Sequence, residues 1–359
     1  MKFVGVDLHK QTITMCVVDA ALNVLVRRRF GNRPTEPIVQ FLASLADFTI
    51  VCEATASYEW FVQLVEPLAQ QVVLAHPGRL RVIAESTRKS DHLDARTLAE
   101  MLAEHRIPRS YRPTPRQRAH RRLVRHRTYL TRRSTSVRNK IRHILADYNL
   151  DRPDLFTEAG QDYLARQSLA PEDRWVIDQL SLERTLYLQQ RRGVDRRLAE
   201  FASQGSPQEQ ADRRRLRTIP GVGEVTVEVL LAELAGIERF SSAKKVVSYA
   251  GLVPGQRESA GKRKNLSIEK TGSPLLRWAL VQAAWQLVQR SPKWGHIYDR
   301  LAQRVGRKKA IIAVTRRLLC VAHTLILKGE DYREVCPVSS ARVSQARKSR
   351  RSRTEEAAI

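Results

Sequence analysis

The pattern of apolar and polar positions in the first hundred residues predicts an α/β domain. Apolar runs that read as strands span 2–8, 12–18, 22–30, 48–53 and 72–75. Only short polar connections separate the first three runs, which is typical of an antiparallel meander. The later runs alternate with helical patterns that begin at Thr35 and at Trp60. Three strands followed by alternating helices and strands fit an RNase H-like sheet better than a doubly wound one.

The middle of the chain shows helical spacing over two long stretches. In the first, apolar residues recur at three-, four- or seven-residue steps at Leu123, Val124, Leu130, Val137, Ile141, Ile144 and Leu145. A second stretch, over about 175–201, has Ile177, Leu180, Leu182, Leu186, Leu188, Val194 and Leu198. A narrow apolar seam needs a partner. We therefore expect an antiparallel coiled coil between the two helices, a dimer interface, or both.

The C-terminal third is predicted to be mostly α. After a linker at 205–207, a helix ends near Leu216, and the turn Ile219-Pro220-Gly221-Val222-Gly223 precedes an apolar helix. This is the form of a helix-hairpin-helix, in which Gly221 and Gly223 let the backbone approach a phosphate; a simple turn between two helices is the alternative. The Ser-, Arg- and Lys-rich tail is expected to be disordered. The predicted domains are 1–108, 109–204, 205–332 and the tail 333–359.

Composition narrows the class of partner. The 359 residues include 63 Lys plus Arg against 37 Asp plus Glu, a formal net charge of +26. Such an excess indicates a polyanionic partner, and nucleic acid, here DNA, is the leading candidate. A membrane partner is not expected, because no apolar run reaches transmembrane length and the N-terminus does not resemble a signal peptide. The four cysteines have no CxxC spacing, which favours a cytoplasmic protein without structural zinc.

Positive charge is concentrated in the first of the two long helices. Fourteen Lys and Arg residues, and no Asp or Glu, lie between Arg106 and Arg142. Helical faces usually mix signs, so we expect this helix to lie along nucleic-acid phosphates, with a solvated face as the alternative. The expected contacts are Arg116, Arg121, Arg122, Arg125, Arg132 and Arg133.

Four acidic residues stand where a metal site is expected. Asp7 and Glu53 each end an apolar strand, and Asp91 and Asp94 lie three apart at the start of a helix. Open α/β sheets place their sites at the carboxyl ends of the strands. Carboxylates in this order suit two Mg²⁺ ions in phosphoryl transfer. The alternatives are solvated aspartates, a strand-end turn former at Asp7 and a surface ion pair at Glu53.

The motifs around these acids resemble those of a known family. Gly5-Val6-Asp7-Leu8-His9-Lys10, Cys52-Glu53-Ala54-Thr55 and Lys89-Ser90-Asp91-His92-Leu93-Asp94-Ala95 look like the N-terminal motifs of the IS-one-ten family of insertion-sequence transposases. The resemblance implies a RuvC-like DEDD catalytic domain. Asp7, Glu53, Asp91 and Asp94 would be its catalytic residues and would bind Mg²⁺, with two ions expected.

A second resemblance lies in the C-terminal third. The segments 251–254, 259–262 and 270–272 are similar to the family's GLxP, Ser-small-Gly-Lys and K-x-G elements, and a helix containing Arg277 follows them. The resemblance implies that Ser259 is the catalytic nucleophile, with Ser267 and Ser273 as nearby competitors. Lys262, Arg263 and Lys264 would give this serine a favourable field for attack on a phosphodiester. These three residues and Arg277 are also expected to contact the nucleic acid.

The resemblance implies a DNA transposase or site-specific recombinase with a covalent phosphoserine intermediate. The distant acidic and serine motifs imply a composite site and a homo-oligomer, a dimer or a tetramer, associated with the nucleoid. Some members of the family use a structured non-coding guide RNA, so such an RNA is a second candidate partner. Two alternatives stay open. One is a metal-dependent endonuclease of the Holliday-junction type that uses water, and the other is a nucleic-acid-binding protein without catalysis.

Overall fold

The computed structural model describes residues 1–55, 57–83, 91–259 and 262–334. Within these ranges it describes the backbone alone over 81–83, 91–94, 256–259 and 262–266. The contacts divide the chain into an N-terminal unit, Met1–Arg112, and a C-terminal unit, Pro113–Ile359. Each unit is treated by itself below.

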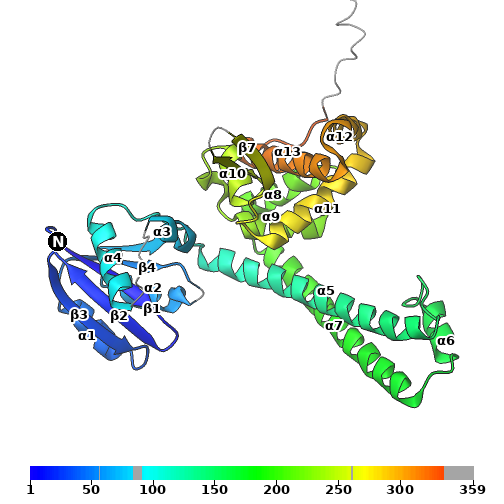
Figure 1. Ribbon diagram of the computed structural model, residues 1–359, viewed down its shortest axis with the longest axis horizontal. Coiled ribbons are helices and arrows are strands. Elements are labelled where there is room, and N and C mark those ends of the chain that lie inside the picture. Colours follow the sequence, from blue (N-terminus) through cyan, green and yellow to red (C-terminus); the bar gives the residue numbers. More distant parts are fainter. Residues whose placement is uncertain (56, 84–90, 260–261, 335–359) are drawn as a thin grey trace, which may run out of the picture. The chain divides into compact units, whose positions relative to one another are not determined.

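The N-terminal unit contains a mixed five-stranded sheet (Figure 1). Its elements are β1 (Lys2–Leu8), β2 (Thr12–Val18), β3 (Val24–Gly31), α1 (Glu36–Ala43), β4 (Phe48–Glu53), α2 (Tyr58–Val65), β5 (Gln71–Ala75), α3 (Pro77–Ile83) and α4 (Asp91–Ala103). The strand order is β3-β2-β1-β4-β5. The pairs β3–β2 and β2–β1 are antiparallel, whereas β1–β4 and β4–β5 are parallel. The order and directions agree with the RNase H-like prediction, and the strands lie within two residues of the predicted runs.

Alternation along the strands gives this sheet two apolar faces. Val4, Val6 and Cys52 face a core shared with α1 and α2. Phe3 and Val51 belong to the opposite core, which also contains residues of α4. At the edge, β3 carries exposed Arg27, Arg28 and Arg29, and charged edges of this kind oppose pairing with another chain.

Gly5 determines how closely α4 approaches the sheet. A Cβ atom at this position would lie 2.0 Å from the carbonyl oxygen of Ala95 and 2.4 Å from the amide nitrogen of Ala99. The backbone of α4 therefore rests directly on the backbone of β1, which only a residue without a side chain permits.

The C-terminal unit begins with a helical hairpin made by α5 (Pro115–Asp147) and α7 (Pro171–Ser203), with α6 (Glu158–Ala165) at the far end (Figure 1). The two long helices pack side by side. Thr114 caps α5 in a reciprocal arrangement with Gln117, and Pro115 follows as the first helical residue. Val137, Ile141 and Leu145 of α5 form a buried cluster with Ile177 and Leu180 of α7.

The remainder of the unit is helical apart from one β-hairpin. It comprises α8 (Pro207–Arg217), α9 (Glu224–Leu234), a 3-10 turn η1 (Ile237–Arg239), α10 (Ala243–Tyr249), β6 (Pro254–Ser259), β7 (Lys262–Ile268), α11 (Pro274–Arg290), α12 (Pro292–Val305) and α13 (Arg307–Lys328). The largest buried cluster of the described residues lies here, and it includes Val124 of α5 and Leu198 of α7. The base of the long hairpin is thus part of this core.

Several expectations from the sequence are wrong in detail. The basic stretch that begins at Arg106 is helical only from Pro115. The segment before it is not helical, and in it the amide of Ser110 donates a hydrogen bond to the carbonyl oxygen of Leu74 on the edge strand β5. The serine-bearing segment, in a region predicted to be mostly α, forms the β6–β7 hairpin. Leu182 and Leu186 of the predicted seam are exposed, so these two residues do not pack against α5, and a dimer interface is the alternative that stays open for them. The tail beyond Glu334, with Cys336, lies outside the described residues.

The prediction that no apolar run reaches transmembrane length is also wrong. Among the described residues, α13 is long and apolar enough to cross a membrane by length and composition. Its most apolar window is 56% buried against the rest of the protein, as in the core helix of a folded domain.

Candidate active site

The geometry of the candidate site begins with Asp7 and Glu53 on neighbouring strands. In the parallel pair β1–β4, Val6 is opposite Cys52, so the next residues, Asp7 and Glu53, stand level with each other where the two strands end. Residues in register on parallel strands point to the same face of a sheet. The fold therefore places these two carboxylates side by side.

Both carboxylates stand on the face that α4 covers. Asp7 follows Gly5 by two residues and Glu53 follows Val51 by two, and Gly5 and Val51 both belong to the face packed against α4. Asp91 is the first residue of α4, one turn before Ala95, the residue that contacts Gly5. Asp94 lies in the same first turn. The helix that carries both aspartates is thus docked on the face of Asp7 and Glu53, while the side chains of Asp91 and Asp94 are not described.

His9 is a neighbour of the site that the sequence alone did not single out. Its Nε2 lies 2.9 Å from Oδ2 of Asp7, with the His9 side chain 47% and the Asp7 side chain 18% exposed. His9 stands just after the end of β1, and its amide donates to the carbonyl oxygen of Thr12, the first residue of β2. The spacing of two residues from Asp7 at a strand end was the available signal.

The chemistry of the donors favours a hard metal ion. Cys52, the neighbour of Glu53, points into the opposite core. Its burial, and to a smaller extent the negative charge of Glu53, raises the pKa of its thiol to about 12. A neutral buried thiol is a poor metal ligand. The described side chains contain no group of three or more His, Cys, Asp and Glu that could hold a metal, which is consistent with half of the predicted ligand set lying outside them.

The predicted nucleophile is the last residue of a strand. Ser259 ends β6 and pairs with Lys262 at the start of β7, and Arg263 and Lys264 continue that strand. The side chains of all four lie outside those described. One competitor has a structural role, because the hydroxyl of Ser273 accepts a hydrogen bond from the amide of Leu276 and caps α11.

Arg277 holds the segment that follows this hairpin. Its Nη1 donates to the carbonyl oxygens of Gly272, at 2.6 Å, and Ala250, at 3.2 Å, and burial lowers the pKa of its guanidinium. The two carbonyl groups come from either side of the hairpin. Arg277 therefore positions the β6–β7 segment against α11.

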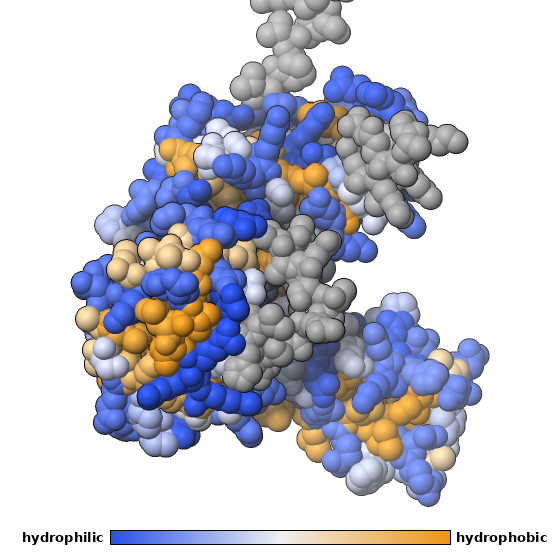
Figure 2. Space-filling view, turned by 60° about the vertical axis from the view of Figure 1, so that its left-hand side comes forward, coloured by the Kyte–Doolittle hydropathy of each residue, from blue (hydrophilic) through white to orange (hydrophobic). Residues whose placement is uncertain are grey.

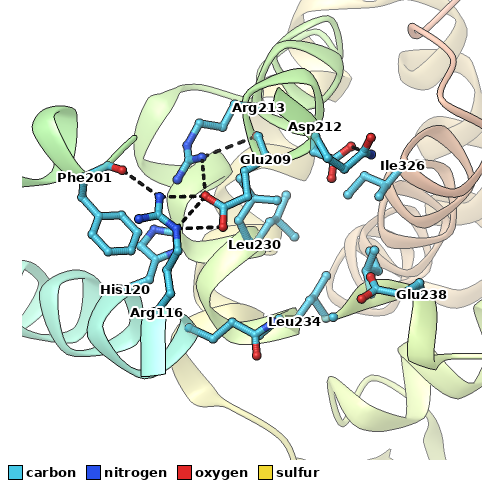
Figure 3. A pocket seen from close by; sticks show the side chains of 16 residues that line it. Arg116, His120, Phe201, Glu209, Asp212, Arg213, Leu230, Leu234, Glu238 and Ile326 are labelled. Atoms are coloured by element: carbon cyan, nitrogen blue, oxygen red, sulfur yellow. Dashed lines mark hydrogen bonds and ion pairs between the residues drawn. The ribbon is translucent and has the colours of Figure 1, made fainter. Parts of the chain in front are cut away.

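The arginines of α5 meet acids from other elements. Arg116 forms an ion pair with Glu209 of α8 at 2.8 Å and lies over the ring of Phe201 (Figure 3). Arg125 pairs with the carboxylate of Glu233, the last acid of α9, at 2.8 Å. The pKa of both guanidinium groups is raised, mainly by the hydrogen bond that each donates to its partner carboxylate.

Two further predicted contacts of α5 are engaged in the same way. Arg121 donates to the carbonyl oxygens of Ala232 and Glu233 near the end of α9, and Arg133 donates to Tyr187 of α7. Arg122 and Arg132 are exposed and make no ion pair within the part of the chain that the structure describes. A run of bases without acids in the sequence thus overstates the free charge of this helix.

A buried ionic cluster joins α5 to α8 and α9. Nε2 of His120 lies 2.5 Å from Oε2 of Glu228, and Nε of Arg213 lies 2.8 Å from Oε1 of the same carboxylate. All three side chains are buried. Burial acts to raise the pKa of Glu228, but the hydrogen bonds from His120 and Arg213 together outweigh it and lower that pKa.

The two glycines of the α8–α9 turn have different surroundings. Gly221 has a φ of +82°, and a Cβ there would lie 2.7 Å from Cβ of Gln286 and from the amide nitrogen of Leu287, both on α11. This glycine is required by packing inside the protein. Gly223 has open space around it and precedes α9 without a side-chain cap, so it alone of the pair stays open to a ligand.

The mixed sheet and the two level carboxylates place the N-terminal unit in the RNase H-like class. Comparison with known families is more specific. A family model of DEDD transposases of the IS110 type, described as Transposase, matches residues 4–150, and the model described as Transposase IS116/IS110/IS902 family matches residues 213–299. The chain belongs to the IS110 family of insertion-sequence transposases, and its N-terminal unit has the RuvC-like fold that the DEDD domain implies.

Two transposases are similar to this chain over most of their length, and a gene-inverting protein is similar over about a third. The transposase for insertion sequence element IS1111A of Coxiella burnetii is 25% identical over 342 residues, which cover 93% of this chain and 92% of that protein. The transposase for element IS1328 of Yersinia enterocolitica is 26% identical over 297 residues, 80% and 84% of the two chains. The pilin gene-inverting protein of Moraxella bovis is 35% identical over 120 residues, 33% and 37% of the two chains.

Proposed function

We propose that this transposase cuts and rejoins DNA strands through a Mg²⁺-dependent acidic site and a serine nucleophile. The observation that carries the proposal is the placement of Asp7 and Glu53, level with each other on neighbouring strands and on the face where α4 docks. Asp91 and Asp94 open that helix. Four carboxylates gathered at one sheet edge repel one another unless cations lie between them.

The residues present fit divalent metal ions. Carboxylate oxygens are the ligands that Mg²⁺ prefers, and four of them suffice for the two ions proposed. When bound, such ions neutralise charge at the scissile phosphate and orient the attacking and leaving oxygens. The protein's contribution is to fix Asp7 and Glu53 through the strand register and to bring the aspartates of α4 to them through Gly5.

Ser259 is proposed to break and re-form the phosphodiester. Its Oγ forms a bond to phosphorus, the bond from phosphorus to a deoxyribose oxygen breaks, and that oxygen takes up a proton to become a free hydroxyl. The serine proton passes to a base. The product is a 5′- or 3′-phosphoserine link, from which a hydroxyl of another strand displaces Ser259 by the reverse step. One phosphoester replaces another, so no nucleotide hydrolysis is needed.

The nucleic-acid contacts are proposed on Arg122, Arg132, Gly223 and the basic strand 262–264. Arg122, Arg132 and Gly223 are exposed, and the strand 262–264 is basic in sequence. In contrast, Arg116, Arg121, Arg125, Gly221 and Arg277 make contacts within the protein. DNA is the proposed partner, and a structured guide RNA is a second one for the same surfaces.

We also propose that the chain acts as a homo-oligomer, a dimer or a tetramer. Trp175, Leu182 and Leu186 of α7 are 65%, 66% and 50% exposed, and their spacings of seven and four residues put them on one helix face. An apolar stripe of this kind on a solvent-facing helix favours contact with a second copy.

The test is strand cleavage by purified variants. Labelled DNA carrying the end junction of the insertion sequence is incubated with Mg²⁺ and any flanking transcript. We expect Asp7→Asn and Glu53→Gln to reduce cleavage by roughly 100-fold or more, because the transition state loses its charge stabilisation, while binding is retained. The matched control is Asp47→Asn, an exposed acid at the opposite end of β4, which should cut normally.

Two outcomes would replace the proposal. Cleavage that is unchanged in Asp7→Asn and Glu53→Gln would show that the acidic site takes no part in catalysis and would leave this unit with a role in binding only. Cleavage that requires both acids but is unchanged in Ser259→Ala would assign it to the metal-dependent endonucleases that use water.

A further inference from the structure

A second basic stretch lies in the last two helices of the C-terminal unit. Between Arg300 and Gly329 the sequence has no Asp or Glu. The same stretch contains eight basic residues: Arg300, Arg304, Arg307, Lys308, Lys309, Arg316, Arg317 and Lys328. It begins on α12, crosses the turn at Gly306 and continues along α13.

The charges of this stretch are not neutralised inside the protein. Seven of the eight residues are exposed and Arg316 is half-buried. Within the described part of the chain none of the eight has an ion-pair partner, whereas Arg116, Arg125 and Arg127 of α5 each pair with an acid of another helix. The stretch that looks less basic in the sequence therefore carries more unpaired charge in the structure. Figure 2 shows one face of the molecule, on which hydrophilic side chains cover much of the surface.

The turn between α12 and α13 is open to a ligand. Gly306 has a φ of +79°, and no atom lies within 4 Å of the position that a Cβ would take. Arg304 stands two residues before it and Arg307 one residue after it. Lys309, Arg316 and Arg317, at spacings of seven and eight residues, extend the positive surface along one face of α13.

The order of charges at this turn does not serve the stability of α13. The first three residues of α13 are Arg307, Lys308 and Lys309, no acid stands in its first turn, and Gly306 provides no side-chain cap. Positive side chains at a helix N-terminus are unfavourable, because they add to the positive end of the helix dipole. A bound anion would reverse the sign of this effect.

We propose that the turn 304–309, together with the exposed face of α13 up to Arg317, binds the phosphodiester backbone of nucleic acid. The inference rests on the proposed function in that the chain acts on DNA, and it adds a surface beyond residues 213–299, where the C-terminal family model matches. Closely spaced guanidinium and ammonium groups without internal acids suit a polyanion with regularly spaced phosphates. The surface carries affinity and not base sequence.

The test is binding of duplex DNA, and separately of a structured RNA transcript, as a function of salt. The variant is Arg304→Gln/Arg307→Gln. The control, Arg152→Gln/Arg197→Gln, makes the same substitutions and the same charge change at arginines that already pair with Asp154 and Glu200. Binding is read without Mg²⁺, so no cleavage intervenes. A second variant, Arg304→Lys/Arg307→Lys, keeps both charges.

We expect the glutamine variant to bind about tenfold more weakly near physiological salt. The slope of log affinity against log salt should fall by about two, one for each phosphate that the variant no longer neutralises. The control and the lysine variant should bind like the wild type. Thermal stability of the glutamine variant should be unchanged or raised, because one unfavourable charge leaves the start of α13. Weaker binding of DNA, of RNA or of both supports the surface and identifies the strand it holds.

Equally weakened binding in the glutamine variant and its control, or unchanged binding of both DNA and RNA by the glutamine variant, would overturn the inference. Those results are distinct from failure of the proposed function. A wild type that binds and cuts DNA, with a glutamine variant that does both equally well, refutes the surface alone.

Discussion

Gly5 is the residue through which the backbone of β1 meets the backbone of α4. Asp7 lies two residues beyond it on the same face, and the helix in contact with it begins at Asp91. Asp7 and Asp91 are more than eighty residues apart in the sequence, and their relative placement depends on the absence of a Cβ atom at Gly5. In the sequence Gly5 stands out only as part of a motif.

We expect Gly5→Ala to abolish DNA cleavage and to destabilise the N-terminal unit by roughly 3 kcal/mol or more, because the added Cβ would overlap the backbone of α4. Cleavage assays and a thermal melt would measure both effects. The matched control is Gly193→Ala, where a Cβ would meet nothing within 4 Å inside α7. That change should leave cleavage intact and raise stability by about 0.5–1 kcal/mol. Normal cleavage by Gly5→Ala would contradict the docking of α4.

At the scale of single residues, the candidate site was predictable where the local pattern determined it. Asp7 and Glu53 follow apolar runs, and the ends of parallel strands meet at one sheet edge. His9 was not predicted, because its contact with Asp7 depends on the turn into β2. The internal contacts of Arg116 with Glu209 and of Arg277 with Gly272 were not predicted, because they join residues that come together only in three dimensions.

Among the elements, α5 illustrates how far charge patterns can mislead. Its sequence has no acid from Pro115 to Ala146, and the acids that neutralise it come from α7, α8 and α9. In the pair Arg116–Glu209, neutralisation by an acid of another helix has an effect that can be measured as a change of stability with pH. The hydrogen bond from Arg116 lowers the pKa of the Glu209 carboxyl from its ordinary value near 4.5.

The contribution of Glu209 to stability should depend on pH. A carboxyl with a lowered pKa in the folded state stabilises the fold above its unfolded pKa, and the stabilisation is lost as pH falls through the folded value. The melting temperature of Glu209→Gln should therefore lie below that of the wild type at pH 7, and the two should converge below about pH 4.5. Glu330→Gln, at an exposed acid, should show no such difference. A gap that is the same at every pH would contradict the ion pair.

The apolar stripe of α7 leads to a prediction about assembly. Leu182 and Leu186 belong to a seam that was predicted to form a coiled coil with α5, a dimer interface, or both, because helical periodicity cannot separate a seam that faces the neighbouring helix from one that faces another copy. We expect Leu182→Gln/Leu186→Gln to lower the mass measured by light scattering to that of a smaller species. Leu25→Gln/Leu327→Gln, at exposed leucines elsewhere, should not change it. An unchanged mass for the first variant would remove α7 from the interface.

Elements with few apolar residues were the hardest to predict. The short helices α3, α6 and α10 and the hairpin β6–β7 lacked a clear period. In contrast, α7 was predicted within four residues at both ends, and α5 begins nine residues after Arg106, the start of the predicted basic helix. That start was misplaced because the same basic residues continue through 106–114, while the helix itself begins at the cap Thr114.

On the scale of the whole molecule, a net charge of +26 indicates a nucleic-acid partner without showing which surface meets it. The structure separates charge that stabilises the fold, along α5, from charge that is exposed and unpaired, along α12 and α13. The order of strands in the N-terminal unit could be anticipated from the sequence. The packing of α5, α8 and α9 around the buried Glu228 could not, because nothing local distinguishes a buried acid from an exposed one.

The central claim is that the acidic site and Ser259 act in one reaction. The most direct test is a denaturing gel of the protein with labelled end-junction DNA, Mg²⁺ and any flanking transcript, read for a slow-migrating adduct that protease removes. We expect the adduct with the wild type and with Ser267→Ala, and its loss in both Ser259→Ala and Asp91→Asn. Free cut ends without an adduct, formed equally well by Ser259→Ala, would contradict the serine mechanism and leave the C-terminal unit with binding alone.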